Sequence, residues 1–223
     1  MKILKSLIPH KIRALFFKWY RLLLKKYWEG VEKQIPKVTL SRIHLEHAKL
    51  LSNREQLLSL LPTNAIVAEI GVAEGDFSEK ILKITKPEKL HLVDFWGSER
   101  YGYAKNVVYH KFENELHEKK VEINLGYSYA VAGSFSDHYF DWIYIDTDHS
   151  YQTTKKELEA YKNKVKPGGI IAGHDYIMGN WISMNRYGVM EAVHEFCLNE
   201  HWQIIYLTTD ILESPSFAIQ KIK

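Results

Sequence analysis

The sequence predicts an α/β fold built on a mostly parallel β-sheet with helices on both faces. Short apolar runs typical of buried strands alternate with longer segments of helical periodicity. One run, residues 66–70, is followed by a glycine turn and by a helix that begins near Asp76, which is the opening unit of nucleotide-type α/β folds. Polar residues directly follow three of the runs, as expected where parallel strands end at a binding edge.

Length and composition fit one such domain with an extension. The chain has 223 residues, of which 46% are hydrophobic and 26% charged, as in ordinary globular proteins. The single cysteine, Cys197, excludes an intramolecular disulfide and a cysteine-based zinc cluster. It also fits a reducing compartment, so we expect a cytoplasmic protein.

The first 30 residues differ from the rest in charge. They hold eight Lys/Arg and one acid, a net charge of +7, whereas the whole chain carries +3. Aromatic and aliphatic residues are interleaved with the basic ones, without the roughly 18-residue apolar run of a spanning helix or the small-residue cleavage site of a secretory signal. We therefore predict a basic aromatic helical extension and linker over residues 1–40, before a domain over residues 41–223.

Two interpretations of the extension stay open at the level of sequence. A basic aromatic helix can lie on an anionic membrane surface, here the inner face of the membrane. It can equally pack on its own domain or on a second copy of the chain in a homo-oligomer. Nucleic acid is not expected as a partner, because the basic charge is confined to this segment.

Periodicity places the elements of the domain in order. Apolar residues at helical spacing predict a helix from about Ser41 to Leu61, which Pro62 ends. The expected strands cover residues 66–70, 91–96, 121–125, 140–146 and 170–173, with helices in the segments between them. A further helix over residues 188–198 precedes two closing strands, residues 202–207 and 216–220.

The glycine turn indicates what kind of ligand the domain holds. Its pattern is E-x-G-x-x-x-G, with Glu69, Gly71 and Gly75 at the fixed positions and Ala73 where a pyrophosphate-binding turn carries its second glycine. The sequence contains no P-loop pattern. An acid on the strand suits the cationic end of a ligand better than a phosphate. A structural turn without a ligand is the alternative here.

A second acid lies at the spacing expected for a nucleoside site. Asp94 ends the next strand, 19 positions after Gly75. An acid about 20 residues beyond such a turn can accept hydrogen bonds from ribose hydroxyls. The alternative for Asp94 is a helix N-cap or a loop carboxylate, but the strand before it and the spacing favour the ribose role.

At these residues the chain resembles the class I S-adenosylmethionine-dependent methyltransferases, whose first motif is E/D-x-G-x-G-x-G. Ala73 departs from that motif at the middle glycine. The resemblance implies a Rossmann-like fold with a seven-stranded sheet, in which residues 202–207 and 216–220 form the last two strands. It implies S-adenosylmethionine as the cofactor, with Ser128 beside the adenine. The candidate cofactor-binding residues are Glu69, Gly71, Ala73, Gly75, Phe77, Asp94, Phe95, Trp96, Ser128 and Asp146.

Polar residues at two later strand ends form a second candidate site. Asp146 ends the strand 140–146, and His174 and Asp175 follow the strand 170–173. If the strands 66–70 and 140–146 are neighbours, Gly71 and Asp146 face one another across the binding edge. Two carboxylates and an imidazole can bind a divalent cation such as Mg²⁺, Ca²⁺ or Mn²⁺. Strand-end polar residues without a metal are the alternative.

Two segments narrow the resemblance. D-T-D-H-S-Y at residues 146–151 and K-P-G-G-I-I-A-G-H-D-Y at residues 166–176 look like a bacterial family that includes the macrocin-type and mycinamicin-type sugar O-methyltransferases, and more distantly catechol O-methyltransferase. This resemblance spans about Pro62 to Lys221. It implies a metal, most simply Mg²⁺, on Asp146, His174 and Asp175, and it implies His149 as the base. In the metal-binding relatives, the His174 position usually carries an oxygen donor.

The implied reaction is transfer of a methyl group to a hydroxyl of a sugar or glycan-related acceptor. Asp146 helps to hold the metal that orients the acceptor, and His149 takes the proton. A methyltransferase without metal, in which His149 and His174 are acid/base groups, is an alternative. So are an oxidoreductase, which the glycine register disfavours, and a non-catalytic adapter at a membrane surface. Aromatic loop residues suited to stack on a sugar ring are Tyr101, Tyr103, Tyr176, Trp181 and Tyr187.

Overall fold

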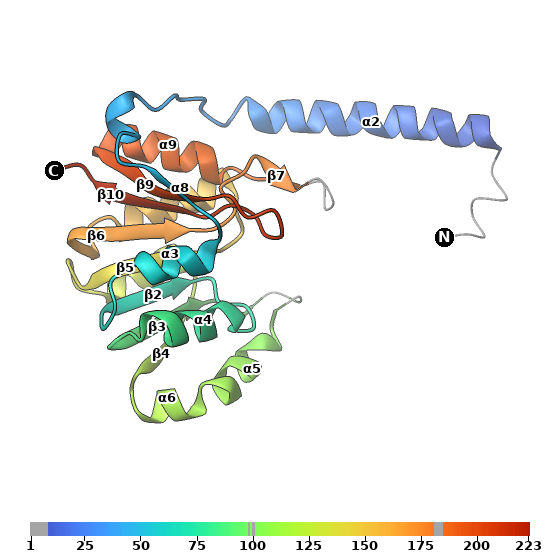
Figure 1. Ribbon diagram of the computed structural model, residues 1–223. Helices are drawn as coiled ribbons and strands as arrows, with labels where there is room; N and C mark the ends of the chain where they lie inside the picture. Colours follow the sequence, from blue (N-terminus) through green and yellow to red (C-terminus); the bar gives the residue numbers. More distant parts are fainter. Residues whose placement is uncertain (1–8, 98, 100, 181–184) are drawn as a thin grey trace. The chain divides into compact units, whose positions relative to one another are not determined.

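One large sheet organises the computed structural model, which describes residues 9–97, 99, 101–180 and 185–223. Within these residues the sheet has eight strands in the order β1-β9-β10-β6-β5-β2-β3-β4. Only β10 runs antiparallel to its neighbours. The strands of the sheet are β1 (Lys49–Leu51), β2 (Ile66–Ile70), β3 (Lys89–Asp94), β4 (Val121–Leu125), β5 (Phe140–Ile145), β6 (Val165–Gly173), β9 (Trp202–Thr208) and β10 (Phe217–Lys221) (Figure 1). Two short strands, β7 (Gly179–Asn180) and β8 (Asn185–Arg186), pair with each other.

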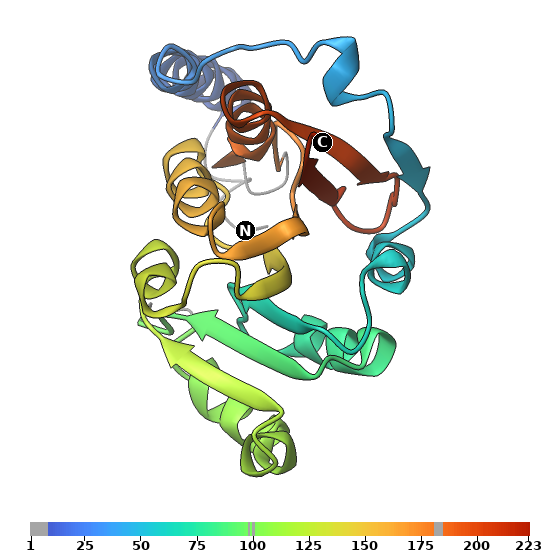
Figure 2. The same cartoon turned by 90° about the vertical axis from the view of Figure 1, so that its left-hand side faces the viewer.

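Helices cover both faces of this sheet (Figure 2). The described helices of the sheet's unit are α3 (Arg54–Leu60), α4 (Asp76–Thr85), α5 (Ala104–Lys111), α6 (Glu113–His117), α7 (Ser128–Val131), α8 (Tyr151–Tyr161) and α9 (Val189–Glu200), with 3₁₀ turns η1 (Arg42–His44) and η2 (Ala132–Ser134). A further helix, α2 (His10–Glu32), belongs to the other unit of the chain. Buried residues of α3, α4 and α5 belong to one core cluster. Helices α8 and α9 pack on the opposite face.

The chain divides into two compact units, Met1–Lys37 and Val38–Lys223. Helix α2 is the described helix of the first unit, and the sheet with its covering helices forms the second. The predicted α/β Rossmann-like fold is confirmed in the second unit. Strands β2 and β4 have the predicted bounds, and those of β3, β5, β9 and β10 lie within two residues of the prediction. Strand β6 begins at Val165, five residues before the predicted start.

The sheet has eight strands rather than the expected seven, because part of the helix that the sequence predicts over residues 41–61 is a strand. Residues 49–51 form β1, which pairs in parallel with β9, and the helix α3 begins only at Arg54. Asn53 is the N-cap of α3, where its side chain accepts a hydrogen bond from the Gln56 N–H at 2.8 Å. The apolar spacing of residues 45–61 is therefore only in part helical, and the pairing with β9 decides the conformation of its first half.

The central strands place the candidate site. In β5 and β2 the side chains of Trp142, Tyr144 and Ile70 are fully buried, as in parallel strands covered on both faces. Ile145 pairs with Ile70 on one side and with Gly173 on the other. The carboxyl ends of β2, β5 and β6 are therefore level with one another, and the residues that follow these strands meet at one edge.

Candidate active site

Backbone hydrogen bonds join the three strand ends beyond the last strand residues. The N–H of Asp146 donates to the carbonyl of Ile70 at 2.7 Å, and the N–H of His174 donates to the carbonyl of Ile145 at 2.9 Å. The glycine turn after β2, Asp146 after β5, and His174 and Asp175 after β6 therefore lie side by side, as the sequence predicted.

Gly71 is in contact with the backbone of Asp146. Its φ is +89°, and a Cβ added there would lie 2.0 Å from the carbonyl oxygen of Asp146. Only glycine combines this backbone conformation with so close an approach. The prediction that Gly71 and Asp146 face each other is confirmed.

The rest of the turn is equally tight. Ala73 has a φ of +49°, and Gly75, with a φ of +77°, is the N-cap of α4. A Cβ on Gly75 would lie 2.8 Å from the ring of Phe112. The turn leads into the N-terminus of α4, where the N-cap Gly75 makes no side-chain hydrogen bond to the first N–H groups of the helix. Such N–H groups can bind a polar ligand.

Asp94 holds the glycine turn in place. Its Oδ2 accepts hydrogen bonds from the N–H groups of Val72 at 2.8 Å and Ala73 at 3.1 Å, and its Oδ1 accepts one from the N–H of Trp96 at 2.8 Å. A carboxylate has about four lone-pair sites, so it can still accept from a ribose hydroxyl. The acid therefore shapes the turn from which the cofactor would be held.

Glu69 and Phe77 lie inside the domain rather than at its edge. Glu69 is only 1% exposed and accepts a hydrogen bond from the Ser78 hydroxyl, which joins β2 to α4. Burial raises the pKa of Glu69 to about 8. The Phe77 ring is buried and packs against Tyr144, with ring centroids 4.4 Å apart. Both residues therefore stabilise the elements on either side of the turn, β2 and α4, from inside the domain.

The aromatic candidates after β3 have opposite environments. Trp96 is buried and its Nε1–H donates to the carbonyl of Ala73 at 2.8 Å. Phe95 is 44% exposed and stacks on Tyr127, with ring centroids 4.4 Å apart. Of the two, Phe95 offers a free aromatic surface. Ser128, at the start of α7, donates its hydroxyl proton to Glu157 at 2.5 Å.

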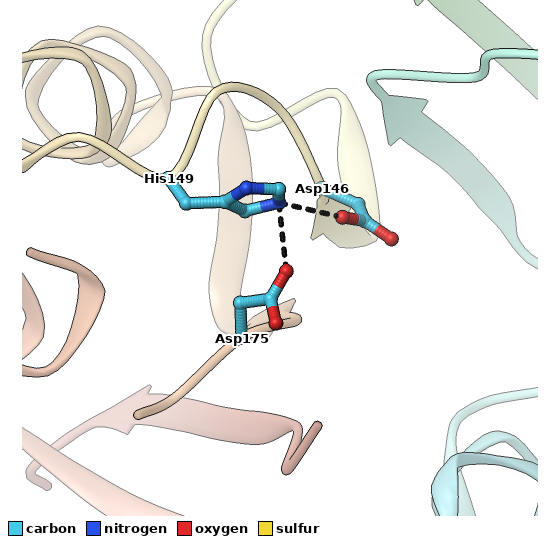
Figure 3. Close-up of side chains that lie close together, drawn as sticks. All are labelled: Asp146, His149 and Asp175. Carbon is cyan, nitrogen blue, oxygen red and sulfur yellow. Dashed lines mark hydrogen bonds and ion pairs between the residues drawn. The ribbon is translucent and has the colours of Figure 1, made fainter. Parts of the chain in front are cut away.

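Two carboxylates converge on one ring nitrogen of His149. Its Nε2 lies 3.1 Å from Asp146 Oδ1 and 2.9 Å from Asp175 Oδ2 (Figure 3). The ring enters from the loop after β5 and points between the two acids. Ligand atoms of the three residues lie within 4.8 Å of one another, as a metal site requires. The donor set of two oxygens and one nitrogen fits a divalent cation.

The charges at this point favour a cation between the acids. Burial opposes the charged imidazolium, but the hydrogen bonds with Asp146 and Asp175 outweigh it and raise the pKa of His149 to about 10. Burial likewise disfavours the charged form of Asp175, yet hydrogen bonds with His149 and His174 hold the pKa of Asp175 well below its usual range. His149 is therefore an imidazolium at neutral pH, and it supplies the positive charge that the carboxylates require.

His174 lies at the margin of this group. Its Nδ1 is 3.4 Å from Asp175 Oδ2 and 3.8 Å from Asp146 Oδ2, while its Nε2 is buried and makes no hydrogen bond within the described residues. The sequence predicted His174 as the nitrogen ligand and His149 as a separate base. The structure instead brings His149 to the meeting point of the two carboxylates.

Left-handed backbone conformations occur at this edge of the sheet. His149 has a φ of +63° and Asp175 a φ of +53°. Such conformations cost about 1 kcal/mol or more in residues other than glycine, and they concentrate at functional sites. For His149 the conformation directs the ring toward the acids. No sequence pattern predicts this backbone conformation.

Arg54 is a site residue that the sequence analysis missed. Its guanidinium lies 3.8 Å from Asp146 Oδ2, 4.5 Å from the centroid of the Phe77 ring, and within 2.5 Å of Glu213 in the loop before β10. The residue lies 92 positions before Asp146 in the chain. Nothing in its local sequence distinguishes it from a surface arginine at a helix start.

Glu157 is a second missed residue. It is fully buried on α8, accepts hydrogen bonds from Ser128 and, at 3.0 Å, from Thr147, and so joins the loops after β4 and β5. Burial raises the pKa of Glu157 to about 7. In the sequence it resembles any helical glutamate.

Of the aromatic candidates for acceptor stacking, Tyr187 lies against the site. Its ring centroid is 4.9 Å from that of His149. Tyr176 instead forms a hydrogen bond with His194 at 2.5 Å. Trp181 lies outside the described residues.

Comparison with known proteins supports the cofactor that this geometry suggests. Residues 68–176, from β2 to the end of the candidate metal site, match the family model Methyltransferase domain (Methyltransf_24). No curated protein is a significant match to the chain. The matched segment contains Gly71, Asp94, Asp146 and Asp175.

Solved structures show the same fold at low identity. An S-adenosylmethionine-dependent methyltransferase from Aquifex aeolicus has a TM-score of 0.56 and 17% identity, over 87% of this chain and 98% of that one. A putative methyltransferase from Streptococcus mutans, solved with S-adenosylhomocysteine, has a TM-score of 0.54 and 17% identity, over 83% and 100%. A putative rRNA-methylase from Clostridium thermocellum has a TM-score of 0.58 and 13% identity, over 83% and 99%. At these identities the likeness shows the fold.

Proposed function

We propose that this chain, an S-adenosylmethionine-dependent methyltransferase, transfers a methyl group to a hydroxyl oxygen of a sugar or glycan-related acceptor with the help of a divalent cation. One observation carries the proposal. Asp146, His149 and Asp175 offer three ligand atoms within 4.8 Å of one another. They do so beside Gly71, where the methyl donor is expected, so a hydroxyl held at these groups would be next to the methyl group.

The turn and its surroundings have the features that a nucleoside-bearing cofactor needs. S-adenosylmethionine supplies an electrophilic methyl group on a sulfonium. Gly71 and Gly75 make the turn tight, with Asp146 and Phe112 packed against them, and Asp94 retains acceptor capacity for ribose hydroxyls. The exposed Phe95 ring, stacked on Tyr127, is an apolar plate suited to the adenine.

Asp146, His149 and Asp175 are the residues that would hold the cation. When bound, a divalent cation would lower the pKa of an acceptor hydroxyl by adding positive charge beside it, so that the hydroxyl could lose its proton to water as its oxygen takes the methyl group from the sulfonium. The two carboxylates orient the hydroxyl, and their charge is otherwise balanced by the His149 imidazolium. We assign His149 as a ligand rather than as the base, because its Nε2 faces both acids; a cation bound there would displace the Nε2 proton, and the neutral imidazole would then supply the lone pair.

Support for a sugar acceptor comes from the residues around the three groups. The segments at residues 146–151 and 166–176 resemble those of sugar O-methyltransferases. The Tyr187 ring lies 4.9 Å from His149, where it can stack against the apolar face of a sugar. Holding the two reacting atoms roughly 3 Å apart would then supply much of the rate.

Transfer from methyl-labelled S-adenosylmethionine to a panel of sugars and phenols tests the proposal. We expect label in a sugar hydroxyl and none in the same sugar with that hydroxyl blocked. Replacing EDTA by Mg²⁺ should raise the rate at least about 100-fold. His149→Ala and Asp175→Asn should abolish most turnover while S-adenosylmethionine binding, measured by calorimetry, stays as in the wild type.

Two outcomes would contradict parts of this assignment. Equal rates in EDTA and Mg²⁺ would leave a methyltransferase without metal, in which the imidazolium of His149 is the only cation between the acids. Label found in phenols alone would contradict the assignment of a sugar as the acceptor.

A further inference from the structure

Helix α2 carries an apolar line and a basic stripe on roughly opposite sides, with two further basic residues, Arg13 and Lys26, outside the stripe. At 3.6 residues per turn, one apolar line runs along the helix through Ile12, Phe16, Trp19, Leu23 and Tyr27. A basic stripe runs along the other side through Lys11, Lys18, Arg21 and Lys25. The two sets recur at spacings of three, four and seven residues, so each remains on its own side for the full length of the helix.

The apolar line consists of large side chains that reach solvent. Ile12 is 58% exposed, Phe16 57% and Trp19 56%. A helix cannot bury its own apolar side, and exposed patches of this kind mark surfaces that meet a protein or a membrane. The apolar side is also wide, since Leu15 and Leu22 flank the line and are likewise exposed.

We propose that α2 lies in the headgroup region of an anionic membrane, with the apolar line toward the acyl chains and the basic stripe toward the phosphates. The charge of the helix is the first reason. Within His10–Glu32 there are six Lys/Arg and two Glu, and basic residues near such a surface are attracted by its anionic lipids. The Trp and Tyr rings are the second reason, because their amphipathic rings suit the interface.

The same features argue against two other roles for α2, a membrane-spanning helix and a coiled coil with a second copy of the chain. In the described residues no helix is long and apolar enough to cross a membrane. Self-association in a coiled coil needs a narrow apolar seam flanked by charges of both signs. The apolar side of α2 is broader than such a seam, and its excess of positive charge would repel a second copy.

Sedimentation of the full chain with lipid vesicles tests the proposal. We expect binding to vesicles of phosphatidylcholine mixed with phosphatidylglycerol, at least about tenfold weaker binding to phosphatidylcholine alone, and a loss of binding as salt is raised. No binding to the anionic vesicles, or equal binding to both kinds, would overturn the proposal.

Paired substitutions assign the binding to α2. Phe16→Glu with Leu23→Glu breaks the apolar line, and Lys18→Glu with Lys25→Glu reverses part of the basic stripe. Each should reduce binding to the anionic vesicles at least about tenfold.

The matched control is Lys49→Glu with Lys83→Glu, which makes the same charge change at exposed positions of the second unit. It should bind the anionic vesicles as the wild type does. Each variant should also bind S-adenosylmethionine as the wild type does, which shows that the domain is folded.

A control that loses as much binding to the anionic vesicles as the α2 variants would contradict the role of α2. A second result would also contradict it: a chain that does not bind the vesicles but forms a dimer, which dissociates when Phe16→Glu and Leu23→Glu are introduced. Helix α2 would then bind a second copy of the chain.

Discussion

Glu69 is a carboxylic acid in the middle of the sheet, and its burial makes stability depend on pH. Its folded-state pKa is about 8, against an ordinary value of 4.5. Below pH 4.5 both the folded and the unfolded chain hold the proton, and the full stabilisation is present. Between pH 4.5 and 8 the unfolded chain releases the proton and the folded chain keeps it, so stability is lost as pH rises.

We therefore expect the free energy of unfolding of the wild type to fall relative to that of Glu69→Gln across this range. The slope has a limit of about 1.4 kcal/mol per pH unit for one proton. Urea unfolding of both proteins from pH 5 to 8 measures it, and the other carboxylates cancel in the difference. Parallel curves would mean that Glu69 is ionised in the folded state.

Gly71 differs from Gly168 in its surroundings but not in its backbone. Their φ values are +89° and +79°, yet a Cβ on Gly168 meets nothing within 4 Å, whereas on Gly71 it would clash with Asp146. Gly168→Ala should cost about 1–2 kcal/mol through the backbone alone. Gly71→Ala should cost at least about 1 kcal/mol more, through the contact.

Only Gly71→Ala should also weaken S-adenosylmethionine binding, because only this glycine belongs to the cofactor turn. Thermal unfolding and calorimetry measure the two effects. Equal losses of stability in both variants would show that the turn moves freely away from Asp146.

At the scale of elements, β1 can be tested through two adjacent leucines. Leu51 is 6% exposed and Leu50 is 73% exposed, as expected for consecutive residues on opposite faces of a strand. Leu51→Ala should destabilise the domain by about 2–5 kcal/mol, and Leu50→Ala by less than about 0.5 kcal/mol. Chemical denaturation measures both, and similar losses at the two positions would argue against the strand.

The elements that the sequence predicted well are those whose signals are local. Strand β2 is an apolar run bounded by Asn64 and Gly71, and β5 is a similar run, whereas β4 alternates apolar and polar residues. Their bounds therefore follow from local pattern and turn residues. Strand β1 has three residues, and its partner β9 lies more than 150 positions later in the chain. Its conformation is set by that pairing, which no window of residues 41–61 contains.

The candidate site follows the same division. Strand order brings Gly71, Asp146 and Asp175 to one edge of the sheet. Their meeting was predictable, because the strands and the polar residues at their ends can be recognised in the sequence. The role of His149 was not, because it depends on a left-handed backbone at one residue. Arg54 reaches Asp146 only through the packing of α3, which sequence spacing does not reveal.

At the scale of the whole molecule, the central proposal is a cation site at the binding edge of the methyltransferase domain. Calorimetric titration of Mn²⁺ into the full chain with S-adenosylmethionine present tests this claim directly. We predict one cation per chain, at least about tenfold weaker binding with Asp175→Asn, and wild-type binding with His174→Asn. No heat of binding in the wild type, or equal binding by Asp175→Asn, would contradict the site, and a loss with His174→Asn would contradict the assignment of His149 as its nitrogen ligand.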